Sequence, residues 1–195
     1  MFKLGLTGSI ATGKSTVLKT FAALGIPTFS ADAAVHALYE GAAVAPLAKL
    51  FPTVVHNGKV DRAALSRHLL AHPAALPSLE AVVHPLVRRE IAGFLAAAEA
   101  KGARLAVIDV PLLFESGYDY GFDAVATTWV DAATQRRRAL ARPAMTVEKL
   151  DAILARQLPQ AEKKRRADYA FDTGVSIRVT EAEVKALVDR LAPND

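Results

Sequence analysis

The chain has 195 residues, of which 52% are hydrophobic and 23% charged, and its formal net charge is +4. This length and composition allow a packed core and exclude an intrinsically disordered chain. The absence of cysteine excludes disulfide-stabilised folds, zinc–thiolate sites and a cysteine nucleophile. No stretch is typical of a membrane-spanning helix or a secretory signal, so we expect a cytoplasmic protein with no membrane partner.

Strand-like and helix-like segments alternate along the chain, which predicts an α/β fold with a parallel sheet covered by helices on both faces. In chain order we expect a strand over 2–7, a helix over 14–24, a strand over 26–29, helices over 32–39, 61–71 and 76–101, strands over 105–110 and 124–130, helices over 132–142, 147–158 and 160–167, a strand over 169–172 and a helix over 180–191. Asp61 is a candidate N-cap, and Pro85 is expected to kink or divide its helix.

The expected strands and helices group into one domain with a five-stranded core, an insertion and a lid. The core comprises residues 1–39, 102–135 and 168–195. Residues 40–101 contain no strand candidate as convincing as those of the core, so we expect a helical insertion on the acceptor side of the sheet. Residues 136–167 are helical and rich in arginine, and we expect them to form a lid.

A glycine-rich segment over residues 8–15, Gly-Ser-Ile-Ala-Thr-Gly-Lys-Ser, matches the phosphate-binding pattern G-x-x-x-x-G-K-[ST] in full. An apolar strand precedes it and a helix follows, so its backbone N–H groups can surround phosphate oxygens at the positive end of a helix. We expect Lys14 to reach the β- and γ-phosphates, Ser15 to bind Mg²⁺ and Thr16 to contact the α-phosphate. The expected nucleotide-binding residues are Gly8, Ala11, Thr12, Gly13, Lys14, Ser15 and Thr16. The alternative is a structural glycine turn before a helix.

Three acidic residues are candidates for the chemistry. Asp32 follows the second expected strand, where ligands gather in a parallel sheet, and can accept or orient the proton of an attacking hydroxyl. The alternative for Asp32 is a helix N-cap. Asp109 ends the third expected strand and can support Mg²⁺, or it is a turn acid before Pro111. Glu115 is a weaker candidate, and a solvated loop charge explains it equally well.

The lid segment carries clustered arginines and lysines. Arg138 and Arg142 are four residues apart, so on a helix they share a face and can clamp a triphosphate. A solvated helix face is the alternative. Residues 163–166, Lys-Lys-Arg-Arg, are expected to be surface charge rather than a nucleic-acid contact, because no aromatic residues are interleaved with them. No histidines lie at metal-ligand spacing. Before any family comparison, His84 is expected to be a partly buried structural histidine.

Taken in order, these motifs resemble the dephospho-CoA kinase family over nearly the whole chain. The His-Pro and Pro-Leu-Leu-Phe-Glu segments are more specific to that family than the phosphate loop is. The matching segments are 6–15, 31–32, 83–87, 111–115, Gln135 with Arg138 and Arg142, 156–157 and 167–172.

The resemblance implies a three-layer P-loop fold and transfer of phosphate from ATP, with Mg²⁺, to the ribose 3′-hydroxyl of 3′-dephospho-CoA. It implies that Lys14, Arg138 and Arg142 serve catalysis, with Asp32 as the presumed base. On the acceptor side it implies binding by Asp32, His84, Pro85, Leu112 and Glu115. The resemblance also implies that Ser15 and Asp109 bind or support the metal ion.

This chain departs from the family pattern at several positions. Family members usually have a second glycine where Ser9 stands, and Gly-Ser where Ala11 and Thr12 stand. Many have an acid in place of Ser30. Thr173 replaces a frequent asparagine, so we expect nucleotide contacts there to differ. The four constrained positions of the phosphate loop are present, and we expect nucleotide binding to persist.

Three other functions compete with this hypothesis. Another small-molecule or nucleoside monophosphate kinase would share the phosphate loop. A nucleotide-dependent switch of the GTPase kind would carry Asn-Lys-x-Asp, which does not occur here. A basic nucleic-acid-binding protein would bind in a strongly salt-dependent way. We expect small-molecule substrates, no nucleic acid, and a monomer or weak homo-oligomer.

Overall fold

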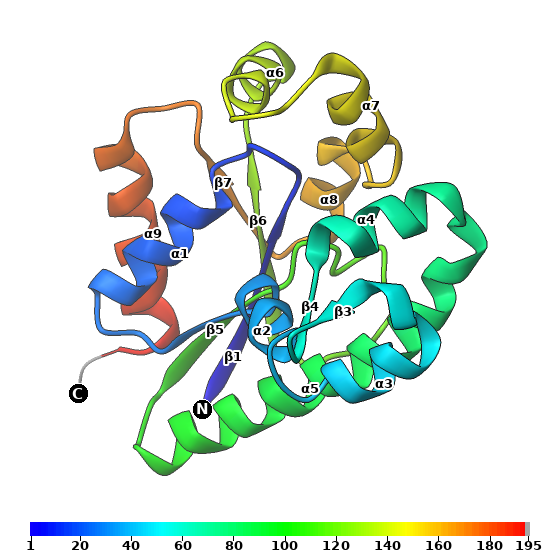
Figure 1. Ribbon diagram of the computed structural model, residues 1–195. Helices are drawn as coiled ribbons and strands as arrows, with labels where there is room; N and C mark the ends of the chain where they lie inside the picture. Colours follow the sequence, from blue (N-terminus) through cyan, green and yellow to red (C-terminus); the bar gives the residue numbers. More distant parts are fainter. Residues whose placement is uncertain (194–195) are drawn as a thin grey trace. The chain divides into compact units, whose positions relative to one another are not determined.

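The computed structural model describes residues 1–193 (Figure 1). Its elements are β1 (Phe2–Gly8), α1 (Lys14–Ala23), β2 (Thr28–Ser30), α2 (Ala31–Leu38), α3 (Val44–Leu50), the 3₁₀ turn η1 (Pro52–Val54), β3 (Val55–His56), β4 (Lys59–Val60), α4 (Arg62–Ala71), the 3₁₀ turn η2 (Pro73–Ala75), α5 (Leu76–Ala100), β5 (Leu105–Asp109), β6 (Ala124–Trp129), α6 (Ala132–Leu140), α7 (Val147–Ala155), α8 (Gln160–Arg166), β7 (Tyr169–Asp172) and α9 (Ile177–Leu191). Among these residues no helix is both long and apolar enough to cross a membrane.

The main sheet has five strands in the order β2-β5-β1-β6-β7, which confirms the expected α/β class. β1 lies at its centre and pairs in parallel with both β5 and β6. The register places Leu6 of β1 beside Asp109 of β5 and Gly8 beside Thr128 of β6. The carboxyl ends of β5, β1 and β6 therefore meet at one edge of the sheet, where ligands bind in folds of this kind.

Helices cover both faces of this sheet. Leu4 and Leu6 of β1 are buried in a core cluster with Val17 and Phe21 of α1 and Val184 of α9. Figure 1 shows α1 and α9 next to each other over the strands. Alternate residues of a strand point to opposite faces, so Thr7 points away from that cluster.

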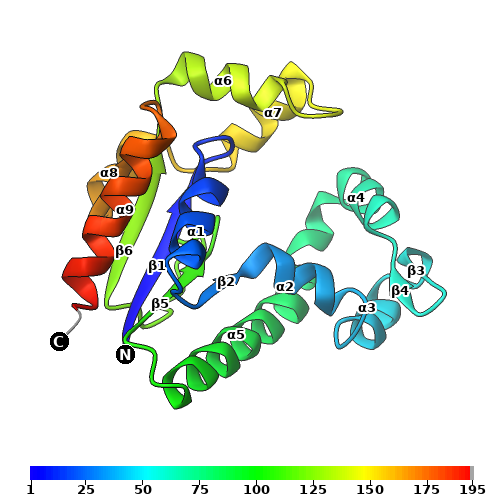
Figure 2. The same cartoon turned by 90° about the vertical axis from the view of Figure 1, so that its left-hand side faces the viewer.

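The carbonyl oxygen of Pro111 locates α8 on the second face. It accepts hydrogen bonds from Thr7 Oγ1 at 3.0 Å and from Lys163 Nζ of α8 at 3.1 Å. Because Thr7 faces away from α1, α8 covers the face opposite to α1 and α9. Figure 2 shows α6 and α7 beyond the carboxyl end of β1.

The chain divides into two compact units, one made of residues 1–29 with the chain from Ala97 onward, the other of Ser30–Ala96. The first unit contains the phosphate loop, nearly all of the sheet and the lid segment. The second starts at Ser30, whereas the sequence-based expectation began the insertion at residue 40. It holds α2 to α4, most of α5 and the small antiparallel pair β3–β4.

Most expected elements are confirmed within a few residues, and three expectations are corrected. The β3–β4 pair was not expected, and it turns at Asn57 and Gly58, whose φ angles are 50° and 73°. Pro85 does not divide its helix, because α5 is continuous from Leu76 to Ala100, and the kink expected at Pro85 stays a prediction. α6 ends at Leu140, so Arg142 lies beyond the helix that was expected to carry it.

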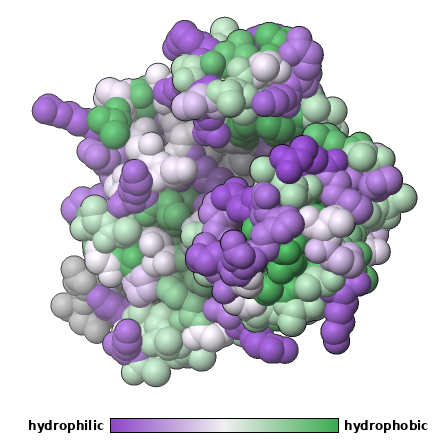
Figure 3. Space-filling view, viewed as in Figure 1, coloured by the Kyte–Doolittle hydropathy of each residue, from purple (hydrophilic) through white to green (hydrophobic). Residues whose placement is uncertain are grey.

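Surface hydrophobic residues do not gather in one element. Those with the largest exposed fractions are Leu70 in α4, Ile177 in α9 and Leu50 in α3. Figure 3 shows hydrophilic and hydrophobic residues interspersed on the face it presents. Scattered apolar side chains of this kind are normal for a protein surface.

Candidate active site

The phosphate-loop segment connects the end of β1 at Gly8 to the start of α1 at Lys14. Its two glycines are required by close packing. A Cβ atom on Gly8 would lie 2.3 Å from Thr128 Oγ1, and one on Gly13 would lie 2.8 Å from Thr173 Cβ. Gly13 also has a φ of 82°, which favours glycine. The loop is therefore a closely packed turn at the amino end of α1, in the place that the sequence pattern predicted.

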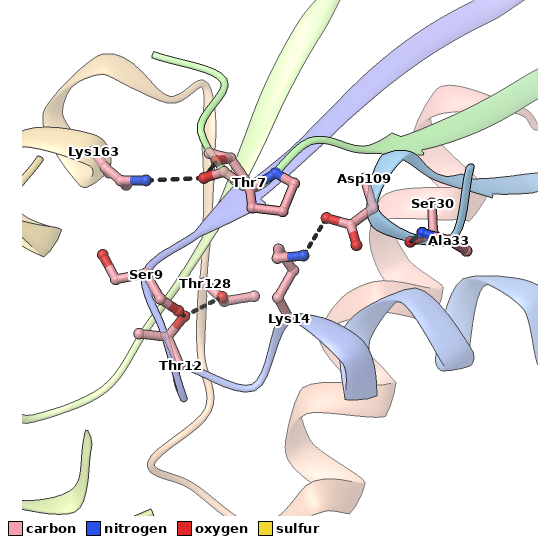
Figure 4. Close-up of polar contacts among 10 residues, drawn as sticks. Thr7, Ser9, Thr12, Lys14, Ser30, Ala33, Asp109, Thr128 and Lys163 are labelled. Atoms are coloured by element: carbon pink, nitrogen blue, oxygen red, sulfur yellow. Dashed lines mark hydrogen bonds and ion pairs between the residues drawn. The ribbon is translucent and has the colours of Figure 1, made fainter. Parts of the chain in front are cut away.

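Lys14 and Asp109 form an ion pair at the ends of neighbouring elements (Figure 4). The side chains of Lys14 and Asp109 are 13% and 6% exposed, so the pair is largely removed from water. Asp109 reaches this place because β5 lies directly beside β1. The carboxylate thus stands next to the phosphate-loop lysine.

Thr12 stabilises the loop through its side chain. Its hydroxyl donates to Ser9 O at 2.8 Å and lies 2.7 Å from Thr128 Oγ1 at the end of β6, as Figure 4 shows. Ser9 and Thr12 are both buried, so neither hydroxyl is exposed to a ligand. By contrast, Ser15 is exposed in the first turn of α1 and Thr16 is half-buried. Ser15 is thus the loop hydroxyl that is open to a metal ion.

Arg138 of α6 reaches the loop through Thr173. Its guanidinium donates to Thr173 Oγ1 at 3.1 Å and to Thr173 O at 2.8 Å. The Thr173 hydroxyl in turn donates to Thr12 O at 2.9 Å. Thr173 therefore contacts the phosphate loop directly, and Arg138 fixes Thr173. Arg142 is exposed beyond the end of α6, so the expected shared helix face with Arg138 is wrong.

Glu115 is partly buried and bound by Lys163 of α8. Lys163 Nζ lies 2.8 Å from Glu115 Oε1, which also accepts from Leu158 N at 2.8 Å. Lys163 is 1% exposed, so the expectation that residues 163–166 are all surface charge is wrong for this residue. Burial lowers the pKa of the Lys163 ammonium, and the hydrogen bond and charge of Glu115 oppose that shift. Glu115 Oε2 is buried and accepts no hydrogen bond from residues 1–193.

The other acceptor-side candidates have open side chains. Leu112 is 44% exposed. His84 and Pro85 are exposed on α5, so the expectation of a partly buried structural histidine is wrong. Asp32 is exposed in the first turn of α2, whose N-cap is Ser30, with Ser30 Oγ accepting from Ala33 N at 3.3 Å. The cap alternative for Asp32 is thereby wrong as well.

Comparison with known proteins identifies the family. The family model described as dephospho-CoA kinase matches residues 2–178. The chain belongs to the dephospho-CoA kinase family. Among curated relatives, a dephospho-CoA kinase of Rhodopseudomonas palustris strain BisB18 is 50% identical over 185 residues, which are 95% of this chain and 93% of the relative.

Solved structures share the fold of this chain. A Thermus thermophilus protein shares 34% identity with a TM-score of 0.84, and 98% of each chain is covered. A dephospho-CoA kinase from Campylobacter jejuni has a TM-score of 0.68 at 22% identity, again over 98% of each chain, and supports the fold. The expected kinase function, consistent with the final step of coenzyme A synthesis, is thus supported over the nucleotide-switch and nucleic-acid-binding alternatives.

Several residues that the structure places at the site were not predicted from the sequence. They are Lys163, Thr128 and Gln160, of which only Lys163 belonged to a noted motif. Nothing in the run Lys-Lys-Arg-Arg marks its first member as buried, because the pairing with Glu115 crosses distant parts of the chain. Thr128 lies in an apolar strand pattern and carries no local signal.

A hollow of about 480 Å³ lies in the same unit, lined in part by Leu24, Arg104 and Lys185. None of the candidate site residues lines it. Its walls come from the α1–β2 turn, the α5–β5 turn and α9, whereas the phosphate loop follows the opposite end of β1. The hollow is therefore separate from the residues that the sequence singles out.

Replacing Lys163 with methionine is expected to destabilise this dephospho-CoA kinase by about 3–5 kcal/mol, because Glu115 would keep a buried charge without its cation. Urea unfolding measures the effect. The double variant Lys163→Met with Glu115→Gln should recover a large part of that loss. Lys164→Met serves as the matched control, since Lys164 lies over the Trp129 ring and should cost at most about 1 kcal/mol. Equal losses at the two lysines would contradict the buried-pair interpretation.

Proposed function

We propose that the chain transfers the γ-phosphate of ATP to the ribose 3′-hydroxyl of 3′-dephospho-CoA, giving ADP and CoA, with the residue roles described below. The observation that carries this proposal is the glycine turn at the amino end of α1, with Lys14 beside Asp109. The family assignment supports the same reaction.

The triphosphate is bound by residues 8–16 in this proposal. The backbone N–H groups of the loop and the positive end of α1 attract its phosphate oxygens. Lys14 has three N–H donors, so it can keep its contact with Asp109 while donating to the β- and γ-phosphates. The lysine is thereby held in place before the nucleotide arrives, which lowers the entropic cost of binding.

Mg²⁺ fits the oxygen donors at this place. Magnesium usually takes one or two protein oxygens together with phosphate oxygens and water. Ser15 offers an exposed hydroxyl and Asp109 a carboxylate beside Lys14. Among residues 1–193 no group of three or more histidine and acidic side chains is placed to bind a metal, which matches an ion carried mainly by the nucleotide. When bound, the ion would neutralise charge on the phosphates.

Asp32 is the proposed base or orienting group for the acceptor hydroxyl. Its carboxylate is exposed, and Ser30 rather than Asp32 caps α2. The side chain is therefore not needed to terminate the helix and can accept a proton or a hydrogen bond from a substrate. His84, Pro85, Leu112 and Glu115 are proposed to contact the acceptor.

The lid arginines have different proposed roles. Arg142 is exposed, and its guanidinium is proposed to bind a phosphate group of the nucleotide. Arg138 is bound to Thr173 in this structure and contributes by fixing the loop, unless nucleotide binding releases it. We further propose residues 40–101 as the acceptor-binding insertion and residues 136–167 as a lid. A cytoplasmic location and a monomeric or weakly oligomeric state remain predictions.

The decisive experiment is an acceptor panel assayed with purified protein, ATP and Mg²⁺. We expect turnover of dephospho-CoA and little turnover of nucleoside monophosphates or shikimate. Good turnover of one of those acceptors without turnover of dephospho-CoA would overturn the acceptor assignment. If the protein bound GTP and ATP with equal affinity and formed no phosphorylated product, the kinase proposal would be overturned.

A further inference from the structure

Both main-chain polar groups of Ile10, inside the phosphate loop, are bound by glutamine side chains. Ile10 N donates to Gln157 Oε1 at 2.9 Å. Gln135 Nε2 donates to Ile10 O at 2.9 Å. Gln157 lies between α7 and α8 in the lid segment, and Gln135 belongs to α6, the helix that leads from the core into the lid segment.

A third glutamine extends these contacts to the sheet. Gln160 Nε2 donates to Gln135 Oε1 at 2.7 Å, and Gln160 Oε1 accepts from Val130 N at 3.0 Å. Gln135 is 6% exposed, and both ends of its amide are used. A carbonyl can only accept and a backbone N–H can only donate, so the orientation of each amide is fixed by its partner. Val130, Gln160, Gln135 and Ile10 thus form one continuous hydrogen-bonded chain.

Apolar contacts join the same two parts of the molecule. Ala11 is 7% exposed and belongs to a small core cluster with Ala139 of α6 and Leu150 of α7. Ile10 packs against this cluster, as does Leu154. Ala11 also has a φ of 60°, which an L residue adopts at a steric cost. The phosphate-binding pattern leaves positions 10 and 11 unspecified, so their burial in the lid is a feature of this chain rather than of the motif.

We propose that Gln135, Gln157 and Gln160 are positioning residues that hold the phosphate loop in its nucleotide-binding conformation from α6 and the lid segment. The inference rests on the proposed phosphate-binding role of residues 8–15. To bind phosphate, the loop must keep its N–H groups directed inward. Gln157 and Gln135 fix the loop at Ile10, one through its N–H group and the other through its carbonyl. Loop and lid then move together, so a lid displaced by mutation weakens ATP binding without touching the nucleotide.

The test compares isosteric changes in two glutamines that both contact Ile10 of the loop. Gln135→Glu replaces a donor with a carboxylate oxygen facing Ile10 O and so removes that hydrogen bond. Gln157→Glu brings the same negative charge to Ile10 but keeps an acceptor for its N–H group. We expect Gln135→Glu to raise the Kd of ATP about 10- to 100-fold, as an unsatisfied buried group would. Gln157→Glu should raise it much less. Calorimetric titration with a non-hydrolysable ATP analogue measures both.

Protonation provides a second readout. A carboxyl group introduced at position 135 regains an O–H donor when protonated, so affinity for the ATP analogue relative to wild type should recover as the pH is lowered. The Gln157→Glu variant should show no such recovery. A purely structural role would lower the melting temperature and leave the affinity, measured well below that temperature, unchanged.

The outcomes separate this inference from the proposed function. Equal losses of ATP affinity in both variants would show that charge alone acts and would overturn the proposal, as would unchanged affinity in Gln135→Glu. If Gln135→Glu does not fold, Gln160→Glu repeats the test one link away, because it keeps the acceptor for Val130 N and loses the donor to Gln135. Unchanged ATP affinity in Gln160→Glu would equally overturn the positioning proposal.

Failure of the wild-type enzyme to phosphorylate dephospho-CoA would instead refute the proposed function.

Discussion

Replacing Lys14 with methionine is expected to lower kcat/KM for ATP by ~10²-fold or more, since a fixed positive group facing the transferred phosphate would be lost. The same change should reduce stability. Asp109 is 4% exposed and would lose the ammonium group that neutralises it. Breaking a buried ion pair from one side costs about 3–5 kcal/mol. Steady-state kinetics and urea unfolding of the same preparation measure the two effects.

A double variant separates those effects. Adding Asp109→Asn to Lys14→Met removes the buried charge, so the free energy of unfolding should return most of the way to the wild-type value. Activity should not return, because the double variant lacks both the lysine and the proposed magnesium-side carboxylate. Recovery of activity along with stability would show that Lys14 serves only the fold. Wild-type kinetics in Lys14→Met would remove it from the proposed site altogether.

Strand β5 was the most readable strand of the main sheet, because it is a short aliphatic run bounded by turn residues. Leu105–Asp109 is buried at every position, as expected for a strand covered on both faces. The β3–β4 pair was missed although its signal is present. Asn57-Gly58 between His56 and Lys59 is the pattern of a two-residue hairpin turn. The strands it joins are two residues long, so the turn rather than the strand pattern was the readable feature.

The phosphate loop was predictable for the same reason that the sheet was, because its chemistry lies within one short segment. The contacts that hold it in place were not. Three glutamines hold the loop from far along the chain: Gln135, Gln157 and Gln160 lie 125, 147 and 150 residues after Ile10. No local pattern shows which side chain will meet which backbone group at such separations. Gln135 and Gln157 were noticed only as parts of a family resemblance, without a role.

The prediction that residues 163–166 are all surface charge was wrong for Lys163 for a related physical reason. On a seven-residue helix such as α8, one face meets the sheet and the other meets water. Lys163 lies on the buried face, three residues after Gln160, while Arg165 and Arg166 bind Glu162 on the exposed side. The sequence shows four cations in a row, and only the fold shows that one of them neutralises Glu115.

The change Asp32→Asn is expected to lower kcat by ~10²-fold or more, because an amide cannot take the proton of the attacking hydroxyl. The KM of ATP should change little, since the proposed triphosphate contacts belong to residues 8–16. Stability should also change little. Ser30 caps α2, and Asp32 is exposed in the first turn, where loss of its charge costs about 0.3–1 kcal/mol. Steady-state kinetics with dephospho-CoA, together with thermal unfolding, measure these quantities.

Glu40→Gln is the matched control for this prediction, because it makes the same carboxylate-to-amide change in the same compact unit. Glu40 is 62% exposed and pairs with Lys59 at 3.2 Å, a surface contact that contributes about 1 kcal/mol at most. Its kcat should equal that of the wild type. Since the phosphoryl-transfer transition state is loose, a loss of only a few-fold in Asp32→Asn would mean that the carboxylate orients the hydroxyl without accepting its proton. Wild-type turnover in Asp32→Asn would remove Asp32 from the reaction.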